Sequence, residues 1–203
     1  MEIDDTYKTI TKPGKEALFK DKNSKFYGYA FPISNEEEAK QHIEALKKQH
    51  HSARHWCYAW RIGESDPIYR ANDDGEPSNS AGQPIYGQLL SKEVTNILVV
   101  VVRYFGGVKL GVGGLINAYK TAAQWALESS KIVKKTIDVT FLLSFEYKDM
   151  NNVMRIIKEH QLDIKDQDLH LTCKILLSVR KSEAHKIKDF FSSLYEVKVA
   201  IID

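Results

Sequence analysis

The sequence predicts an α+β protein of two domains, with residues 1–133 in the first and 134–203 in the second. Two patterns carry this expectation. An apolar, valine-rich run at 97–102 leads into a glycine-rich loop and then into helical periodicity, which is typical of a buried strand followed by a loop and a helix. After Ser130 the pattern restarts as strand, helix, strand, strand, helix, strand, the βαββαβ order of a ferredoxin-like unit.

Short strands and one amphipathic helix are expected before the valine run. Strands are predicted at 7–11, 16–20 and 26–31, where turn residues separate strand-type segments. Ser34 precedes Glu37 by three residues, as in a capping box, and predicts the start of a helix. Further strands are expected at 55–62 and 68–71, a loop at 72–84 and a short helix at 85–90.

The second domain is predicted element by element. Strands are expected at 136–145, 162–169, 171–179 and 197–201. Asp149 and Ser182 are expected to cap the two helices. The lysine-rich segment 131–135 is interpreted as a solvated hinge between the domains.

Composition limits the function to a few classes. The chain has 203 residues, 43% of them hydrophobic and 28% charged, and a net charge of +2, so any binding of a polyanion must be local. Its two cysteines are too few for a disulfide framework, which fits free thiols in a reducing compartment. The acidic start of the chain has no apolar signal segment and no stretch reaches membrane-spanning length, so we expect a cytoplasmic protein with no membrane partner.

The glycine-rich loop is the first candidate site. Glycines permit positive φ and close backbone approach, and the first amides of the following helix lack intrahelical partners and can receive an anion. Arg103 and Lys109 add positive charge. The spacing fits neither a Walker loop nor a dinucleotide-binding loop, and tight packing of helix on sheet is an alternative role for the glycines.

An acidic loop is the second candidate. Asp73, Asp74 and Glu76 lie within four positions and could hold Mg²⁺ or supply a general base. An acidic surface turn is the commoner role for such a segment. Ser78 and Ser80 nearby allow a hydrolase, although no G-x-S-x-G motif supports one.

A histidine and cysteine cluster is the third candidate. His50, His51, His55 and Cys57 lack the spacing of a metal site, and none is predicted. His55 and Cys57 share one strand face and are either core residues or neighbours of the glycine loop, where His55 and Arg54 could hold a phosphate. Nearby aromatic residues such as Trp56 and Tyr58 could stack on bases, but burial is their usual role.

The chain resembles the YigZ/IMPACT family in three motif regions. The matching residues are Asp73-Asp74-Gly75-Glu76-Pro77-Ser78 with Ala81-Gly82 and Pro84; Val102-Arg103-Tyr104-Phe105-Gly106-Gly107 with Lys109-Leu110-Gly111, Gly113-Gly114-Leu115 and Ala118-Tyr119; and Ala53-Arg54-His55 with Cys57-Tyr58-Ala59. The chain departs from the family pattern at Asn79-Ser80, where a Gly-Thr pair is expected, and at Gln83, where an arginine is expected. The loss of that arginine removes one cation from the expected site.

This resemblance implies a fold and a function. The first domain should resemble domain IV of elongation factor G and a small-subunit ribosomal protein, and the second should resemble domain V of that factor. We therefore expect a non-catalytic regulator of translation that binds RNA, the ribosome or another phosphate-bearing ligand, with a translation-related protein as a further partner and no cofactor. The expected phosphate-binding or nucleic-acid-binding residues are Arg54, His55, Arg103, Gly106, Gly107, Lys109, Gly111, Gly113 and Gly114.

Two other functions stay open. The first is an enzyme that acts on a phosphorylated small molecule, or a hydrolase, with Asp73, Asp74 and Glu76 as its catalytic or metal-holding residues. The second is a protein-docking surface formed by the same conspicuous residues.

Overall fold

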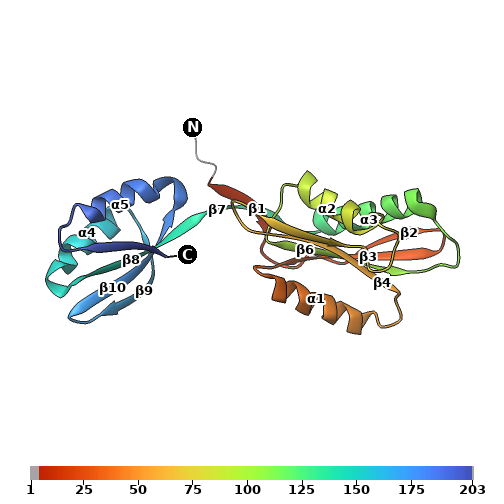
Figure 1. Ribbon diagram of the computed structural model, residues 1–203, viewed down its shortest axis with the longest axis horizontal. Coiled ribbons are helices and arrows are strands. Elements are labelled where there is room, and N and C mark those ends of the chain that lie inside the picture. Colours follow the sequence, from red (N-terminus) through yellow and green to blue (C-terminus); the bar gives the residue numbers. More distant parts are fainter. Residues whose placement is uncertain (1–4, 203) are drawn as a thin grey trace. The chain divides into compact units, whose positions relative to one another are not determined.

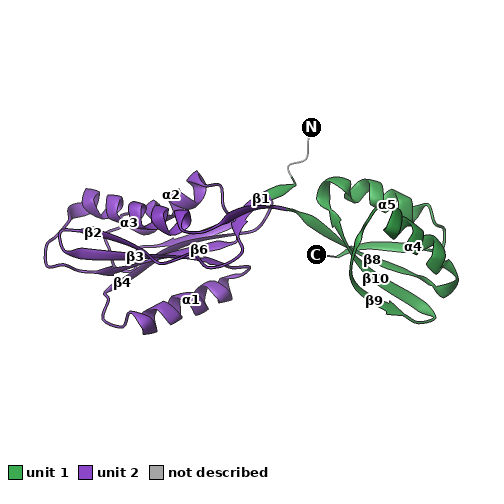
Figure 2. Cartoon of the chain, turned by 180° about the vertical axis from the view of Figure 1, so that it is seen from behind, with its two compact units in different colours: residues 1–6, 136–203 green, residues 7–135 purple. Residues whose placement is uncertain are grey.

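The structure is a computed structural model that describes residues 5–202. The chain divides into two compact units (Figure 2). One unit is 7–135, and the other combines 1–6 with 136–203. Mixed helices and strands in both units agree with the predicted α+β class. No helix within the described residues is long and apolar enough to cross a membrane.

Unit 7–135 is built on a five-stranded sheet with the strand order β2-β3-β6-β4-β5. Each neighbouring pair is antiparallel. The strands are β2 (Ala17–Asp21), β3 (Ser24–Pro32), β6 (Ile97–Tyr104), β4 (His55–Ile62) and β5 (Ile68–Asn72). The valine-rich β6 is therefore the central strand, as the apolar run 97–102 predicts.

Helices cover both faces of this sheet (Figure 1). Helices α2 (Gly82–Ser91) and α3 (Gly111–Glu128) lie on one face, and α1 (Glu36–Gln49) lies on the other. Val99 and Val101 belong to the core beneath α2 and α3, whereas Val100 and Val102 belong to the core beneath α1. Alternate valines thus face opposite cores, which explains why every one of them is fully buried.

The start of each helix in this unit differs from its predicted position. Asn35, not Ser34, caps α1, and its side chain accepts a hydrogen bond from the backbone N–H of Glu38. Glu38 in turn accepts from the backbone N–H of Ser34, the residue before the cap, so the arrangement resembles a capping box that is shifted by one residue. Helix α2 begins three residues before the predicted Ile85, and α3 begins at Gly111, inside the glycine-rich segment that was expected to precede it as a loop.

Most of the segment 131–135, which was expected to be a solvated hinge, forms a strand. Segment β7 (Ile132–Thr136) pairs with β1 (Thr6–Ile10) in a two-stranded sheet. Ile132 and Val133 are half-buried, while Lys134 and Lys135 are exposed. The interpretation as a hinge used the lysines and overlooked the β-branched pair beside them.

The second unit has the predicted βαββαβ order. Its antiparallel sheet has the order β11-β8-β10-β9. The elements are β8 (Asp138–Glu146), α4 (Met150–Glu159), β9 (Asp163–Leu169), β10 (Thr172–Arg180), α5 (Ala184–Ser192) and β11 (Lys198–Ile202). Alternate apolar residues of β8 and β10 pack with both helices in a separate core.

The predicted caps of this unit do not form as expected. Asp149 occupies the N-cap position of α4 but makes no capping hydrogen bond to the described helix. Glu183, and not Ser182, occupies the N-cap position of α5. A short 3-10 turn precedes each helix. Because this turn includes the polar residue that the sequence suggests as the cap, the side chain of that residue is not placed to cap the α-helix.

Candidate functional site

The glycine-rich loop joins the buried end of β6 to the exposed start of α3. Gly106 lies so close to the turn before β3 that an added Cβ would be 2.1 Å from the backbone carbon of Asn23. Gly107 and Gly111 have φ angles of +86° and +74°, which L side chains rarely adopt. Gly106 therefore serves close packing, whereas Gly107 and Gly111 serve the turning of the backbone.

The first turn of α3 is open. Leu110 occupies its N-cap position and provides no side-chain hydrogen bond, and the first turn holds no acidic residue. Gly111, Val112 and Gly113 are exposed. An open N-terminal turn of an 18-residue helix carries unpaired amides and the positive end of the helix dipole, so it favours an anion.

A pocket of about 450 Å³ lies beside this turn, and we call it the α3 pocket. It gathers five of the nine predicted phosphate-binding residues: Arg54, His55, Arg103, Lys109 and Gly111. Its apolar lining consists of Pro77, Phe105, Leu110, Val112 and Leu115. The other predicted residues, Gly106, Gly107, Gly113 and Gly114, belong to the adjacent loop and helix start but do not line the pocket.

Arg103 is not an exposed cation. Its Nη1 donates to Oε1 of Glu76 over 2.6 Å, and the Tyr119 hydroxyl donates to the same oxygen over 2.7 Å. The side chains of Arg103 and Glu76 are only 6% and 4% exposed. Glu76 therefore balances the charge of Arg103 inside the protein, and the exposed positive charge at the pocket comes from Arg54 and Lys109.

His55 has a defined orientation at the pocket. Its Nδ1 lies 2.9 Å from the carbonyl oxygen of Asp74. Because a carbonyl only accepts, Nδ1 must carry the proton, and Nε2 of the neutral ring is left as an acceptor. That Nε2 lies 3.9 Å from Oε1 of Glu76. The predicted strand face of His55 thus opens toward the glycine loop.

The three carboxylates of the acidic loop point to three different places. Asp73 accepts backbone N–H groups of Asn79, Ala81 and Gly82 over 2.8–2.9 Å and so holds the start of α2. Asp74 accepts the N–H of Trp56 over 2.7 Å, whereas Glu76 faces the α3 pocket. Among the described residues no group of three or more histidine, cysteine, aspartate or glutamate side chains could hold a metal ion.

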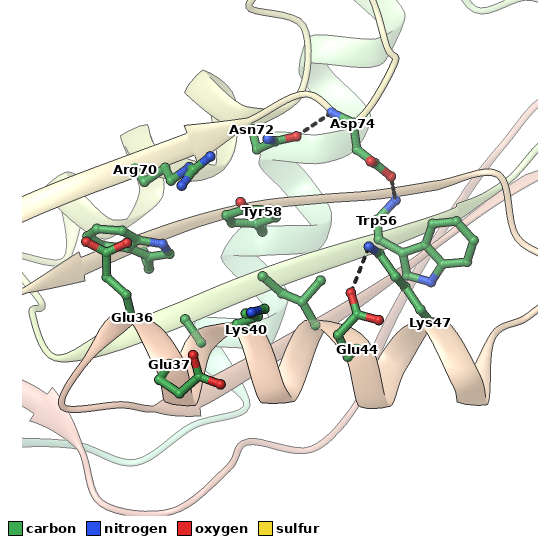
Figure 3. Close-up of a pocket in the computed structure, with 13 residues that line it drawn as sticks. Glu36, Glu37, Lys40, Glu44, Lys47, Trp56, Tyr58, Arg70, Asn72 and Asp74 are labelled. Carbon is green, nitrogen blue, oxygen red and sulfur yellow. Dashed lines mark hydrogen bonds and ion pairs between the residues drawn. The ribbon is translucent and has the colours of Figure 1, made fainter.

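Asp74 borders a second cavity of about 390 Å³ between α1 and strands β4 and β5 (Figure 3). Trp56, Tyr58 and Trp60 line its sheet side because alternate residues of β4 share one face. Its rim carries both carboxylates, such as Glu44, and cations, such as Lys47 (Figure 3). The sequence indicates aromatic residues such as Trp56 and Tyr58 but not the cavity, since only the packing of α1 defines its other wall.

Two members of the histidine and cysteine cluster, His50 and Cys57, are structural. His50 is buried between the hydroxyls of Tyr29 and Tyr104, at 2.6 and 2.9 Å. Cys57 is fully buried and donates to the carbonyl oxygen of Asp73, and burial raises the pKa of its thiol far above the ordinary value. Neither residue reaches the α3 pocket.

Comparison with known proteins identifies the family. The model of the Impact N-terminal domain matches residues 22–127. This chain belongs to the IMPACT family. The IMPACT family member YvyE of Bacillus subtilis is 33% identical over 93% of this chain and 87% of its own length. The IMPACT family member YigZ of Escherichia coli is 33% identical over 85% of this chain and 84% of its own length.

A solved structure supports the fold over both units. The crystal structure of a protein described as hypothetical covers 99% of each chain with a TM-score of 0.75 and 27% identity. The match to the IMPACT domain model spans the acidic loop, β6, the glycine loop and α3, and therefore the whole α3 pocket. One departure from the expected family pattern has a structural explanation: Asn79 has a φ of +60°, a conformation in which glycine is favoured and asparagine is tolerated.

Proposed function

We propose that this IMPACT-family protein is a non-catalytic regulator of translation that binds RNA, including RNA of the ribosome, at the α3 pocket. The observation that carries the proposal is the convergence of an open helix start with the exposed cations Arg54 and Lys109 on one concave site. Phosphate groups are received at helix N-termini by backbone amides and by nearby cationic side chains. The role in translation rests on the family resemblance.

The near-neutral net charge favours local binding over a broad electrostatic surface. With a net charge of +2, the chain has no overall field to hold a nucleic acid, so the contacts at the pocket must supply the affinity. Arg103 contributes little net charge because it is paired with Glu76. We therefore expect binding that depends on a few phosphates and that weakens steeply as salt is raised.

A salt titration of RNA binding tests this proposal. Filter binding of a structured RNA at several salt concentrations should give a slope of log affinity against log salt that corresponds to a few phosphates. Lys109→Ala should reduce that slope by about one phosphate contact. Lys120→Ala is the matched control, since Lys120 is an exposed lysine of α3 that does not line the pocket. An absence of binding at low salt, or equal effects of the two variants, would overturn the proposal.

An enzyme acting on a phosphorylated small molecule is the second candidate. It is favoured by one observation, the approach of His55 Nε2 to Glu76 Oε1 at the pocket, over 3.9 Å. Asp73 and Asp74 are occupied by backbone hydrogen bonds, so such chemistry would depend on His55 and Glu76. The test measures phosphate release from a panel of phosphomonoesters by the wild type and by His55→Ala. If the protein is non-catalytic, the two should release phosphate at the same rate. Release that the wild type shows and the variant lacks would establish the enzyme instead.

A further inference from the structure

The α3 pocket separates its polar groups by depth. Glu76 and Arg103 are almost fully buried, with side chains 4% and 6% exposed, and His55 is 22% exposed. Arg54 and Lys109 are exposed. The interior thus offers hydrogen-bonding groups whose charges are balanced, while the mouth offers positive charge. A ligand that matches this order carries a polar, uncharged part inward and a negative charge outward.

The interior groups meet at one carboxylate oxygen. Oε1 of Glu76 lies 2.6 Å from Nη1 of Arg103 and 3.9 Å from Nε2 of His55. Both hydrogen bonds to Glu76 reach Oε1, and Oε2 accepts none from any described residue. Nε of Arg103 is buried and has no partner within the described part of the chain.

These groups present a donor and two acceptors. The guanidinium of Arg103 retains N–H groups beyond the one given to Glu76, and Oε2 of Glu76 is an acceptor. In the His55 tautomer that carries its single proton on Nδ1, Nε2 is a second acceptor. A ligand that pairs with all three groups needs an edge with one acceptor beside two adjacent donors. Guanine has this edge, with O6, N1–H and the N2 amino group. Adenine, cytosine and uracil each present a single donor group on that edge.

The pocket walls suit a base with an attached phosphate. Phe105 and Val112 supply apolar surface at the side of the pocket, and both are about half exposed, at 45% and 54%. Aromatic and apolar side chains contact the faces of unstacked bases in single-stranded RNA. A volume of about 450 Å³ lies in the range of sites for small ligands. Lys109 and the first amides of α3 then lie at the mouth, where the phosphate would be.

We propose that the α3 pocket binds a guanine nucleotide unit of an RNA strand, with the base inward against Glu76, Arg103 and His55 and the phosphate at the mouth near Lys109. This inference rests on the proposed function and adds the identity of the base that is recognised.

Binding of short oligonucleotides tests the base preference. Fluorescence anisotropy is measured with labelled RNA pentamers that differ only at the centre: UUGUU, UUAUU, UUCUU and UUUUU. UUGUU should bind about tenfold more tightly than each of the other three, within the range of discrimination that a bidentate base contact gives. Equal affinities would overturn the guanine assignment while leaving phosphate binding intact. No binding of any pentamer at low salt would overturn both proposals.

Competition distinguishes a strand from a free nucleotide. Unlabelled GMP should displace UUGUU, but at a higher concentration than unlabelled UUGUU, because the strand supplies further phosphate contacts. AMP at the same concentration should not displace it. Displacement by GMP at a lower concentration than by the pentamer would overturn the assignment to an RNA strand.

Two variants test the pocket itself. Glu76→Gln removes the acceptor charge and should abolish the preference for UUGUU, but it also weakens the pairing with the buried Arg103 and can unfold the unit. Val112→Trp fills the pocket from its exposed wall without changing Glu76, and should remove the preference in a folded protein. Ile116→Trp is the control, since Ile116 is an exposed residue of α3 outside the pocket lining. A full preference retained by Val112→Trp would overturn the proposal.

Discussion

Nη1 of Arg103 lies 2.6 Å from Oε1 of Glu76, and both side chains are buried. Tyr119 donates to the same carboxylate oxygen from α3. The contact joins three separate segments, the end of β6, the acidic loop and the helix that follows the glycine loop. It gives the pocket a nearly neutral interior and leaves Arg54 and Lys109 as its exposed cations.

The buried pair predicts an asymmetric response to mutation. Arg103→Met leaves the Glu76 carboxylate buried with one remaining donor, so the free energy of unfolding should fall by about 3–5 kcal/mol. The double variant Arg103→Met, Glu76→Leu leaves no unpaired charge and should lose less than Arg103→Met alone. Urea denaturation measures both. A double variant that is less stable than the single one would show that the carboxylate does not depend on Arg103 for compensation.

The glycine loop predicts opposite effects at two neighbouring positions. Gly111 has a φ of +74°, so Gly111→Ala should destabilise the protein by about 1–2 kcal/mol. Gly113 lies in α3 with no described atom near an added Cβ, so Gly113→Ala should stabilise the helix by up to about 1 kcal/mol. Thermal melts of the two variants provide the comparison. A Gly111→Ala variant as stable as the wild type or more stable would mean that the backbone at Gly111 is not constrained.

The buried His50 predicts a loss of stability in mild acid. Burial lowers the pKa of His50 below its ordinary value of 6.5, so the unfolded chain takes up a proton at a higher pH than the folded protein does. The free energy of unfolding should therefore decline as the pH falls below about 6.5. Burial also lowers the pKa of His42, so His50→Gln should reduce this decline without abolishing it. His51→Gln, at an exposed position, should leave the decline unchanged. Equal pH profiles for wild type and His50→Gln would contradict the assignment.

The two cysteines should be unreactive in the folded protein. Cys57 and Cys173 are fully buried, and burial raises the pKa of the Cys57 thiol. Because the thiolate is the reactive form, alkylation by iodoacetamide at pH 8 should be slow in buffer and fast in denaturant. Mass spectrometry follows the labelling. Rapid modification of native protein at Cys57 would show that the core beneath α2 and α3 opens readily.

Much of the fold follows from local sequence patterns. The valines of β6 predict a strand buried on both faces, and alternate valines do belong to two cores. The βαββαβ order of the second unit follows from its periodicity. The likeness to domains IV and V of elongation factor G and the domain boundary at 133 stay predictions. The sequence predicts the starts of helices less accurately. Ser34 and Asn35 are both good N-cap residues, and only the backbone conformation shows that Asn35 is the cap.

The site was predictable in its residues but not in its pairing. The sequence does not distinguish Arg103 from Lys109, yet Arg103 is buried against Glu76 and Lys109 is exposed. Nothing in the local sequence shows that Glu76, 27 positions away, turns toward Arg103 while Asp73 and Asp74 turn elsewhere. Such pairing depends on how the acidic loop folds back on the sheet, which is a long-range property.

The most direct test of the central claim is to locate the ligand on the protein. Backbone amide signals in ¹H–¹⁵N NMR spectra are followed while a short RNA is added at low salt. We expect the largest shifts at Gly111, Val112 and Gly113, the open first turn of α3, with smaller shifts at Lys120 farther along the helix. Shifts that leave the first turn unchanged and concentrate on another surface would contradict binding at the α3 pocket.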